Sequence, residues 1–248
     1  MEVSTPKESK ILSSSVMIVD DLFAMLKKYG QGDYISEPIS QIEHSLQAAN
    51  CAKEAGSSDA TIVAALLHDC GQILPQHILE NQILSFRDQL GGYVGLGNQR
   101  SYTVTSTDSH STPPMDQDGL LIIGRHGHDI LGGMYLESRG FPPEVYELVR
   151  DHVVAKRYLC AVDEQYYEGL SEGSKRSLEF QGGPFEGIQI EQFEKDPLFA
   201  EKVQMRKFDD GAKIIGAKVP FIDEYREIAV KVLDLARKSE SEAVQVHG

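Results

Sequence analysis

Apolar residues recur three or four positions apart along most of this chain, which is the spacing of one face of a helix. The pattern predicts amphipathic helices over residues 13–29 and 41–55, the second with Ser40 as its N-cap. Residues 59–70 are mostly apolar, so we expect a buried helix there, with Gly71 as its stop signal.

The helical spacing returns in the second half of the chain. The helices expected there cover about residues 119–139, 142–159, 163–180, 189–195, 197–215 and 220–237. The sequence shows no convincing alternating strand pattern and no internal repeat. It therefore predicts an all-α helical bundle in one domain over 13–237, with polar, frayed ends at 1–12 and 238–248.

One stretch, at about 75–118, breaks this pattern. It is rich in Gly, Ser, Thr and Pro and has weak periodicity, which predicts a long loop-rich insertion. Such an insertion could serve as a lid or an oligomer contact, or it could be a plain surface loop.

Charge narrows the classes of partner. The chain has 24 Lys and Arg against 38 Asp and Glu, a formal net charge of −14. This argues against nucleic acid and anionic membranes as partners, because both favour a basic surface. A small anionic or zwitterionic substrate is compatible with this charge if a few basic residues gather in one pocket.

The three cysteines have no CxxC spacing, and the N-terminus lacks the apolar core of a signal peptide. No apolar run approaches the roughly 18 residues of a membrane span. We therefore expect a soluble, cytoplasmic protein. Its oligomeric state is left open by these patterns.

Histidine and aspartate provide the candidate chemistry. His68 and Asp69 lie in the apolar helix, where unpaired polar groups are costly to bury. Taken alone, they could simply bond a backbone carbonyl and a basic residue. Other predicted helices, however, also carry such groups: His44, His128, His152 and Asp209. Helices that each turn an imidazole or carboxylate inward are typical of a metal site, and iron, manganese, zinc or nickel would suit these ligands.

This order of residues, H…HD…H…H…D, resembles the HD-domain superfamily, most of whose members are metal-dependent phosphohydrolases. Longer motifs are similar to the phosphonate-degrading branch of the HD-domain mixed-valent diiron oxygenases, which includes 2-amino-1-hydroxyethylphosphonate dioxygenase. Myo-inositol oxygenase is a more distant relative of that branch. The motifs are DYISEPISQIEH (33–44), LLHDCGQ (66–72), HVVAKRYLCAV (152–162), LSEGSKRSLEFQGGP (170–184) and RKFDDGAK (206–213). The resemblance covers about residues 20–74 and 119–225.

The resemblance implies two irons, Fe(II) and Fe(III), with O2 as co-substrate. It makes His44, His68, Asp69 and Asp209 ligands of one iron, while Asp69 bridges to a second iron held by His128 and His152. His126 is a rival for His128, but the family spacing H-x-x-x-G favours His128. Asp209 is favoured over Asp210 because it follows Arg206 by three residues.

The resemblance also assigns substrate contacts. Tyr34 matches a tyrosine that occupies an iron position until substrate binds, and Glu37 matches a carboxylate that meets the substrate's ammonium group. The positions matching the phosphonate pocket are Lys156, Ser174, Ser177, Gln181 and Arg206. Gln72 stands where the aminohydroxyethylphosphonate enzyme has a histidine, so the substrate can differ.

The expected activity is O2-dependent cleavage of the C–P bond in a 1-hydroxy-2-aminoethylphosphonate-type substrate, N-methylated or not, to phosphate and a carboxylic acid such as glycine. Three alternatives stay open: a diiron oxygenase that cleaves a C–C or C–N bond in a non-phosphonate metabolite, a metal-dependent phosphohydrolase, and a binding module with a vestigial site. Two irons per chain would separate the oxygenases from the others.

Overall fold

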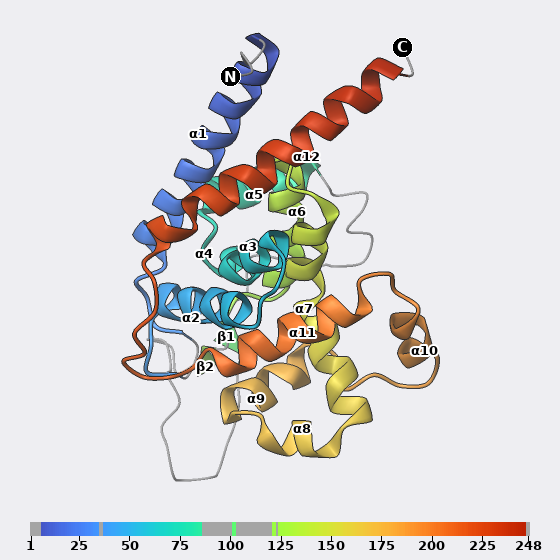
Figure 1. The fold of residues 1–248 in the computed structure, drawn as a ribbon. Coiled ribbons are helices and arrows are strands. Elements are labelled where there is room, and N and C mark those ends of the chain that lie inside the picture. Colours follow the sequence, from blue (N-terminus) through green and yellow to red (C-terminus); the bar gives the residue numbers. More distant parts are fainter. Residues whose placement is uncertain (1–5, 35–36, 86–100, 103–120, 123, 247–248) are drawn as a thin grey trace.

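Helices dominate the computed structural model, which describes residues 6–34, 37–85, 101–102, 121–122 and 124–246 (Figure 1). The helices in the first half are α1 (Pro6–Tyr29), α2 (Gln41–Glu54), α3 (Asp59–Leu67), α4 (Cys70–Ile73), α5 (Gln76–Ser85) and α6 (His128–Ser138). Those that follow are α7 (Pro143–Val162), α8 (Glu164–Gly169), α9 (Glu172–Phe180), α10 (Ile188–Glu194), α11 (Phe199–Gly211), the 3-10 helix η1 (Ile222–Tyr225) and α12 (Arg226–Val246). The predicted all-α fold is confirmed.

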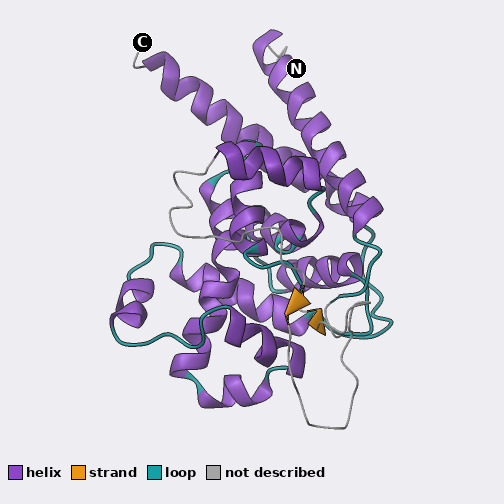
Figure 2. Ribbon diagram, turned by 180° about the vertical axis from the view of Figure 1, so that it is seen from behind, coloured by secondary structure: helices purple, strands orange, loops and turns teal. Residues whose placement is uncertain are grey.

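The only strands in the described part of the chain are β1 (Ser101–Tyr102) and β2 (Leu121–Ile122), which pair antiparallel (Figure 2). The insertion predicted over 75–118 begins with a helix rather than a loop, since α5 occupies Gln76–Ser85. Leu79 of that helix is buried in the main core, which explains why the segment is helical. Residues 86–100 and 103–118 of the predicted insertion lie outside the described residues.

The central core is formed by α1, α2, α3, α6, α7, α11 and α12, whose apolar side chains make one cluster. α1 and α12 pack together and project from one end of the molecule, while α8, α9 and α10 form a lobe at the other end (Figure 1). Both terminal helices extend into the segments predicted to be frayed, because α1 begins at Pro6 and α12 ends at Val246.

α2 begins at Ser40, as predicted. The Ser40 hydroxyl accepts a hydrogen bond from the Glu43 amide, and the Glu43 carboxylate accepts one from the Ser40 amide, which is a capping box. This cap fixes the start of the helix that carries His44.

The predicted helix over 59–70 ends three residues early, so the prediction that Gly71 stops it is wrong. α3 ends at Leu67, and Asp69 adopts φ −100° and ψ 13° before the short α4 begins. Gly71 instead allows a close approach, since a Cβ there would lie 1.8 Å from the His128 carbonyl oxygen. The turn places His68 and Asp69 at the end of a buried helix and beside α6.

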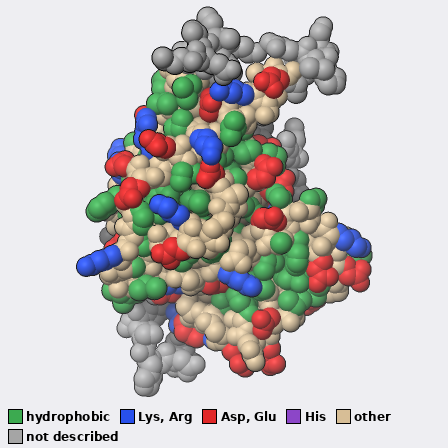
Figure 3. Space-filling model, viewed as in Figure 1, with side chains coloured by type: hydrophobic (Ala, Val, Ile, Leu, Met, Phe, Trp, Pro, Cys, Tyr) green, Lys and Arg blue, Asp and Glu red, His purple; other side chains and the backbone are tan. Residues whose placement is uncertain are grey.

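Side chains on the face seen in Figure 3 are mixed, with many acidic groups among hydrophobic and basic ones. Among the described residues, no helix is both long and apolar enough to cross a membrane.

Candidate metal centre

Two groups of buried ligands meet at the centre of the bundle. The first contains His44 of α2, His68 at the end of α3, and Asp209 of α11. The His44 Nε2 atom lies 2.9 Å from His68 Nε2 and 3.3 Å from Asp209 Oδ1. Two consecutive helices near the start of the chain and α11 near its end therefore direct ligand atoms to one point.

The second group contains Asp69, His128 and His152, which are also buried. His128 is the first residue of α6, and His152 lies in the middle of α7. Their Nε2 atoms are 3.2 Å apart, and Asp69 Oδ1 lies 3.2 Å from His128 Nε2 and 3.7 Å from His152 Nε2. His128, and not its rival His126, belongs to this group.

The Asp69 carboxylate lies between the two groups. Its Oδ1 faces His128 and His152, while its Oδ2 lies 3.5 Å from His68 Nε2 and 3.7 Å from His44 Nε2. One oxygen for each group is the arrangement of a carboxylate that bridges two metal ions.

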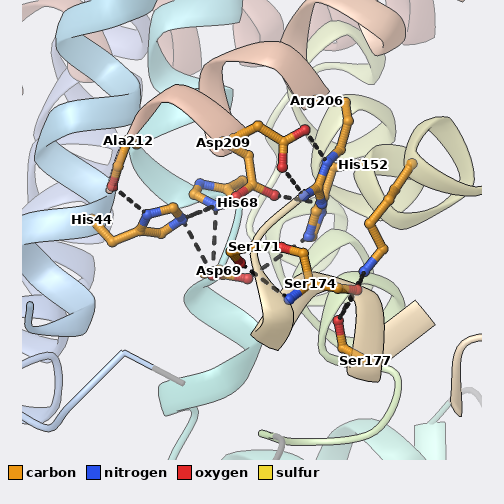
Figure 4. A network of polar contacts seen from close by, with 12 residues as sticks. His44, His68, Asp69, His152, Ser171, Ser174, Ser177, Arg206, Asp209 and Ala212 are labelled. Carbon is orange, nitrogen blue, oxygen red and sulfur yellow. Dashed lines mark hydrogen bonds and ion pairs between the residues drawn. The ribbon is translucent and has the colours of Figure 1, made fainter. Parts of the chain in front are cut away.

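The four imidazole rings are oriented by their other nitrogen atoms. Each Nδ1 donates to a backbone carbonyl, and the pairs are His44 to Ala212 (2.8 Å), His68 to Ala65 (2.8 Å), His128 to Arg125 (3.1 Å) and His152 to Val149 (2.7 Å). Figure 4 shows the His44 contact with Ala212 at one edge of the network. In neutral rings this leaves every Nε2 with a lone pair directed at the centre, as metal ligation requires.

The Nε2 and carboxylate oxygen atoms are better placed to bind metal ions than to contact one another. Two unprotonated imidazole nitrogens about 3 Å apart repel, whereas one ion binding both at about 2.1 Å and at right angles would hold them about 3.0 Å apart. Asp69 Oδ1 is buried and makes no hydrogen bond among the described residues. Two buried His/Asp groups sharing one carboxylate therefore form a dinuclear metal site, and the donor types suit iron, manganese, zinc or nickel.

Burial and neighbouring charges set the protonation of the ligands. Burial lowers the pKa of His68, and it lowers the pKa of His152 to about 3, so both rings are neutral near pH 7. Burial alone would raise the pKa of Asp209, but the Arg206 guanidinium and His44 outweigh it and hold this pKa well below its usual range. For Asp69, burial is likewise outweighed, by His68 and His128, so its pKa is lowered. Neutral imidazoles and ionised carboxylates are the forms that bind cations.

Tyr34 covers the first group. Its ring stacks on the His44 ring, with centroids 3.8 Å apart, and its hydroxyl lies 3.5 Å from Asp209 Oδ1. Burial, together with the nearby Asp209 charge, raises the pKa of Tyr34 well above its usual value, so the phenol is protonated in this arrangement. Glu37 lies in the following turn, where its amide donates to the Tyr34 carbonyl.

A small cavity of about 40 Å³, here called the metal chamber, opens beside the two groups. Its wall includes Asp69, Asp209, His128 and His152 together with most residues predicted to contact substrate: Tyr34, Gln72, Lys156, Ser174, Ser177, Gln181 and Arg206. Glu37 is half-buried and is not among the lining residues.

Hydrogen-bond donors gather on one side of the metal chamber. Lys156 Nζ donates to Ser177 Oγ over 2.9 Å and lies 3.4 Å from the Ser174 carbonyl. Burial and the neighbouring Arg206 lower the pKa of Lys156 to about 7. The Gln72 Oε1 atom accepts from the Arg125 amide over 2.7 Å, so its Nε2 atom remains as a donor group.

Sequence reasoning missed that Asp210 and Tyr166 hold the Arg206 side chain in place. Its guanidinium pairs with Asp209 Oδ2 over 2.7 Å and forms a two-pronged ion pair with Asp210. The Tyr166 hydroxyl donates to Asp210 over 2.5 Å, and Arg206 Nε donates to the Tyr166 oxygen over 3.1 Å. The Arg206–Asp210 pair has i, i+4 helical spacing and was visible in the sequence, whereas nothing there linked Tyr166 of α8 to α11.

Lys213 was also missed. Its ammonium group donates to Ser174 Oγ over 3.0 Å, lies 3.8 Å from Asp210 and stands 6.0 Å from the centroid of the Tyr34 ring. It is thus a further cation close to the serine side of the metal chamber.

A third acidic group, Glu147, Asp151 and Asp196, resembles a metal site only by composition. The Lys202 ammonium group lies 2.6–3.1 Å from all three carboxylates and fills the position of a cation.

The comparisons with known proteins agree with this geometry. The family model "HD domain" matches residues 42–170, which include all five residues of the H…HD…H…H pattern: His44, His68, Asp69, His128 and His152. Over 207 residues, 84% of each chain, the protein is 34% identical to the hydroxymethylphosphonate dioxygenase of Gimesia maris. It is 28% identical over 232 residues, 94% of this chain and 97% of the other, to the [1-hydroxy-2-(trimethylamino)ethyl]phosphonate dioxygenase (glycine-betaine-forming) of Leisingera caerulea.

A further relative is the uncharacterized protein L432 of Acanthamoeba polyphaga mimivirus, 27% identical over 215 residues, or 87% of this chain and 81% of the other. The chain belongs to the HD domain family and is related to the phosphonate dioxygenases.

Proposed function

We propose that the protein is an O2-dependent diiron oxygenase that cleaves the C–P bond of a 1-hydroxyphosphonate, including substrates of the 1-hydroxy-2-aminoethylphosphonate type. The observation that carries this proposal is the Asp69 carboxylate, which gives one oxygen to each ligand group beside a chamber lined with hydrogen-bond donors. Two of the relatives are named for oxygenation of hydroxyphosphonates, which supports the same reaction class.

In this proposal His44, His68 and Asp209 would hold one iron, His128 and His152 would hold the other, and the Asp69 carboxylate would serve both. The iron pair, one Fe(II) and one Fe(III), would supply the activation of O2 when bound. Tyr34 covers the first group and would leave this position when substrate enters.

Lys156, Ser174, Ser177 and Arg206 would bind the phosphonate oxygens, which accept hydrogen bonds and carry negative charge. Arg206 shares its charge with Asp209 and Asp210, so Lys156 and the serine hydroxyls have the larger role in holding the anion. Gln72 and Gln181 would contact the rest of the substrate, and Glu37 would reach an ammonium group only after its turn moves with Tyr34.

The overall reaction balances with one O2. A 1-hydroxyphosphonate dianion and O2 give a carboxylate, hydrogen phosphate and one proton, so both atoms of O2 appear in the products. The C–H, the C–P bond and the O–O bond break, and C1 is oxidised while O2 is reduced. The protein's own residues hold the phosphonate, orient the hydroxyl carbon towards the metal groups and limit the space for water.

The proposal is tested by phosphate release from hydroxymethylphosphonate and from 1-hydroxy-2-aminoethylphosphonate, in air and under anaerobic conditions, with protein loaded with iron. We expect release with at least one of the two, only with O2, and about one O2 consumed for each phosphate. Elemental analysis should find two irons per chain. Phosphate release without O2, or from phosphomonoesters with manganese or nickel, would show a phosphohydrolase instead.

A further inference from the structure

A second, much larger cavity adjoins the metal chamber. This side chamber has a volume of about 420 Å³ and lies between α6, α7 and α9. It shares four wall residues with the metal chamber: His128, Val153, Ser177 and Gln181. The two chambers therefore meet where His128, from the second ligand group, lies near Ser177 and Gln181, which are proposed to contact substrate.

The two volumes differ in what they can hold. About 40 Å³ suffices for roughly three water molecules, so the metal chamber fits little more than a phosphonate and its hydroxymethyl carbon. A cavity of about 420 Å³ is in the range of pockets that bind whole small organic molecules. A substituent on the hydroxyl-bearing carbon would have to leave the metal chamber, and the side chamber adjoins it.

The side chamber carries no excess of charge among its described wall residues. Three arginines and three carboxylates line it, namely Arg125, Arg150, Arg157, Asp129, Glu137 and Asp151. The arginines are engaged: Arg125 donates to the Gly71 carbonyl, Arg150 pairs with Asp151, and Arg157 donates to the carbonyls of Gly182 and Gly183. Ile130, Met134, Val153, Val154 and Phe180 add apolar surface. This lining suits an uncharged, partly apolar group better than a second anion or a lone cation.

Gln181 marks the junction of the two chambers. It lines both of them, and its Oε1 atom is buried without a hydrogen-bond partner among the described residues. Burying an acceptor without a hydrogen bond is unfavourable, and a ligand that donates to it would remove this cost.

We propose that the side chamber holds the substituent on C1 of the preferred substrate, and that this preferred substituent is uncharged, with an N–H or O–H donor that meets Gln181 Oε1 and an apolar portion beyond it. The inference rests on the proposed function, because it takes the phosphonate to lie on Lys156 and the serines. It assigns Gln181 as a specificity-determining residue and a longer substrate than those for which the two relatives are named.

The test uses three ligands. 2-(Butanoylamino)-1-hydroxyethylphosphonate has an amide N–H followed by a propyl chain, and 1-hydroxy-4-oxoheptylphosphonate replaces that N–H by a methylene group. Hydroxymethylphosphonate has no substituent. Kd is measured by calorimetry on iron-loaded protein without O2, so that binding is read apart from turnover.

The wild-type protein should bind the amide compound at least about tenfold more tightly than hydroxymethylphosphonate, and at least about fivefold more tightly than the ketone. In Gln181→Leu, which keeps the size but removes the acceptor, the preference for the amide over the ketone should disappear. Ile130→Phe narrows the side chamber, so it should reduce about tenfold the preference for the amide compound over hydroxymethylphosphonate. Ile130→Val is the matched control and should leave this preference unchanged.

The outcomes distinguish failure of the side-chamber inference from failure of the proposed function. If hydroxymethylphosphonate binds and releases phosphate in air but the amide compound binds no more tightly, the side-chamber inference is wrong and the proposed function stands. The inference is also overturned if Gln181→Leu keeps the amide preference. If none of the three compounds binds, and neither they nor 1-hydroxy-2-aminoethylphosphonate releases phosphate in air, the proposed function itself fails.

Discussion

At the scale of single residues, adjacent aspartates have different roles. Asp209 Oδ1 lies 3.3 Å from His44 Nε2 in the first ligand group, whereas Asp210 pairs with Arg206 and accepts from Tyr166. The two side chains leave the same turn of α11 on different sides. Their substitution therefore separates ligation from support of the anion site.

Asp209→Asn should lower the iron content from two to about one per chain, because an amide is a weak ligand for a hard cation. Asp210→Asn should retain both irons and raise the KM for phosphonate by about tenfold, because Arg206 loses one of its two charged partners and is held less firmly beside the metal chamber. Elemental analysis and steady-state kinetics measure the two effects. Equal iron loss in both variants would contradict this division of roles.

Lys156 offers a prediction on pH. Its pKa is lowered to about 7, so the ammonium group is present below that pH and is lost as the pH rises through about 7, whereas an exposed lysine would stay charged. The Kd for phosphonate should therefore rise with pH above about 7, by up to about tenfold per pH unit. In Lys156→Arg the guanidinium remains charged, so this part of the pH dependence should vanish.

Calorimetric titrations of both proteins at several pH values measure the effect, and the phosphonate's own ionisation is common to both. The same dependence of Kd on pH in Lys156→Arg would show that Lys156 does not hold the anion.

At the scale of secondary-structure elements, the short α4 and the start of α6 approach closely enough to bring Asp69 to His128. A Cβ at Gly71 would lie 1.8 Å from the His128 carbonyl oxygen and 2.9 Å from the Gly132 amide nitrogen, both of them backbone atoms. Backbone cannot rotate away from such a contact as a side chain can.

Gly71→Ala should therefore destabilise the protein by at least about 2 kcal/mol, through overpacking, and should reduce metal binding by the second group. The matched control is Gly169→Ala in α8, where a Cβ would meet nothing within 4 Å. Urea unfolding and metal content measure the two effects. Equal stability of the two variants would show that α4 and α6 separate easily.

At the scale of the whole molecule, four helices and the segment between α3 and α4 supply the candidate metal ligands, so metal binding should be linked to folding. The six ligands come from α2, α6, α7, α11 and the segment between α3 and α4. A metal bound only by the folded state stabilises it by about 2.7 kcal/mol at a hundredfold excess over Kd.

Removal of the metal by a chelator should lower the Tm by roughly 5–10 °C for a chain of this size, and adding Fe(II) should restore it. Thermal unfolding followed by fluorescence or calorimetry measures the change, with Asp209→Asn showing a smaller shift. An unchanged Tm after complete metal removal would show that the site is formed independently of the ion.

Helical spacing in the sequence predicted the fold class, and the resemblance to the HD-domain family singled out the residues that the structure gathers into two groups. Helical spacing places His152 on the apolar face of its helix, and the adjacent pair His68–Asp69 is a compact motif. The ends of helices, and the contacts between residues far apart in the sequence, were harder to predict. The early end of α3 depends on the approach of α6 to Gly71, and the Tyr166–Asp210 contact joins helices far apart in the chain. Such contacts arise from tertiary packing, which periodicity does not encode.

Three of the four imidazoles bond a carbonyl just three residues before them: His68 to Ala65, His128 to Arg125 and His152 to Val149. Each of these ligands thus carries its own anchor within a single turn of chain, and no neighbouring helix is needed to turn the ring. The other side chains that line the two chambers can therefore be exchanged without changing which ring nitrogen faces the centre of the ligand groups. A scaffold built in this way can acquire new substrates while its metal chemistry stays constant.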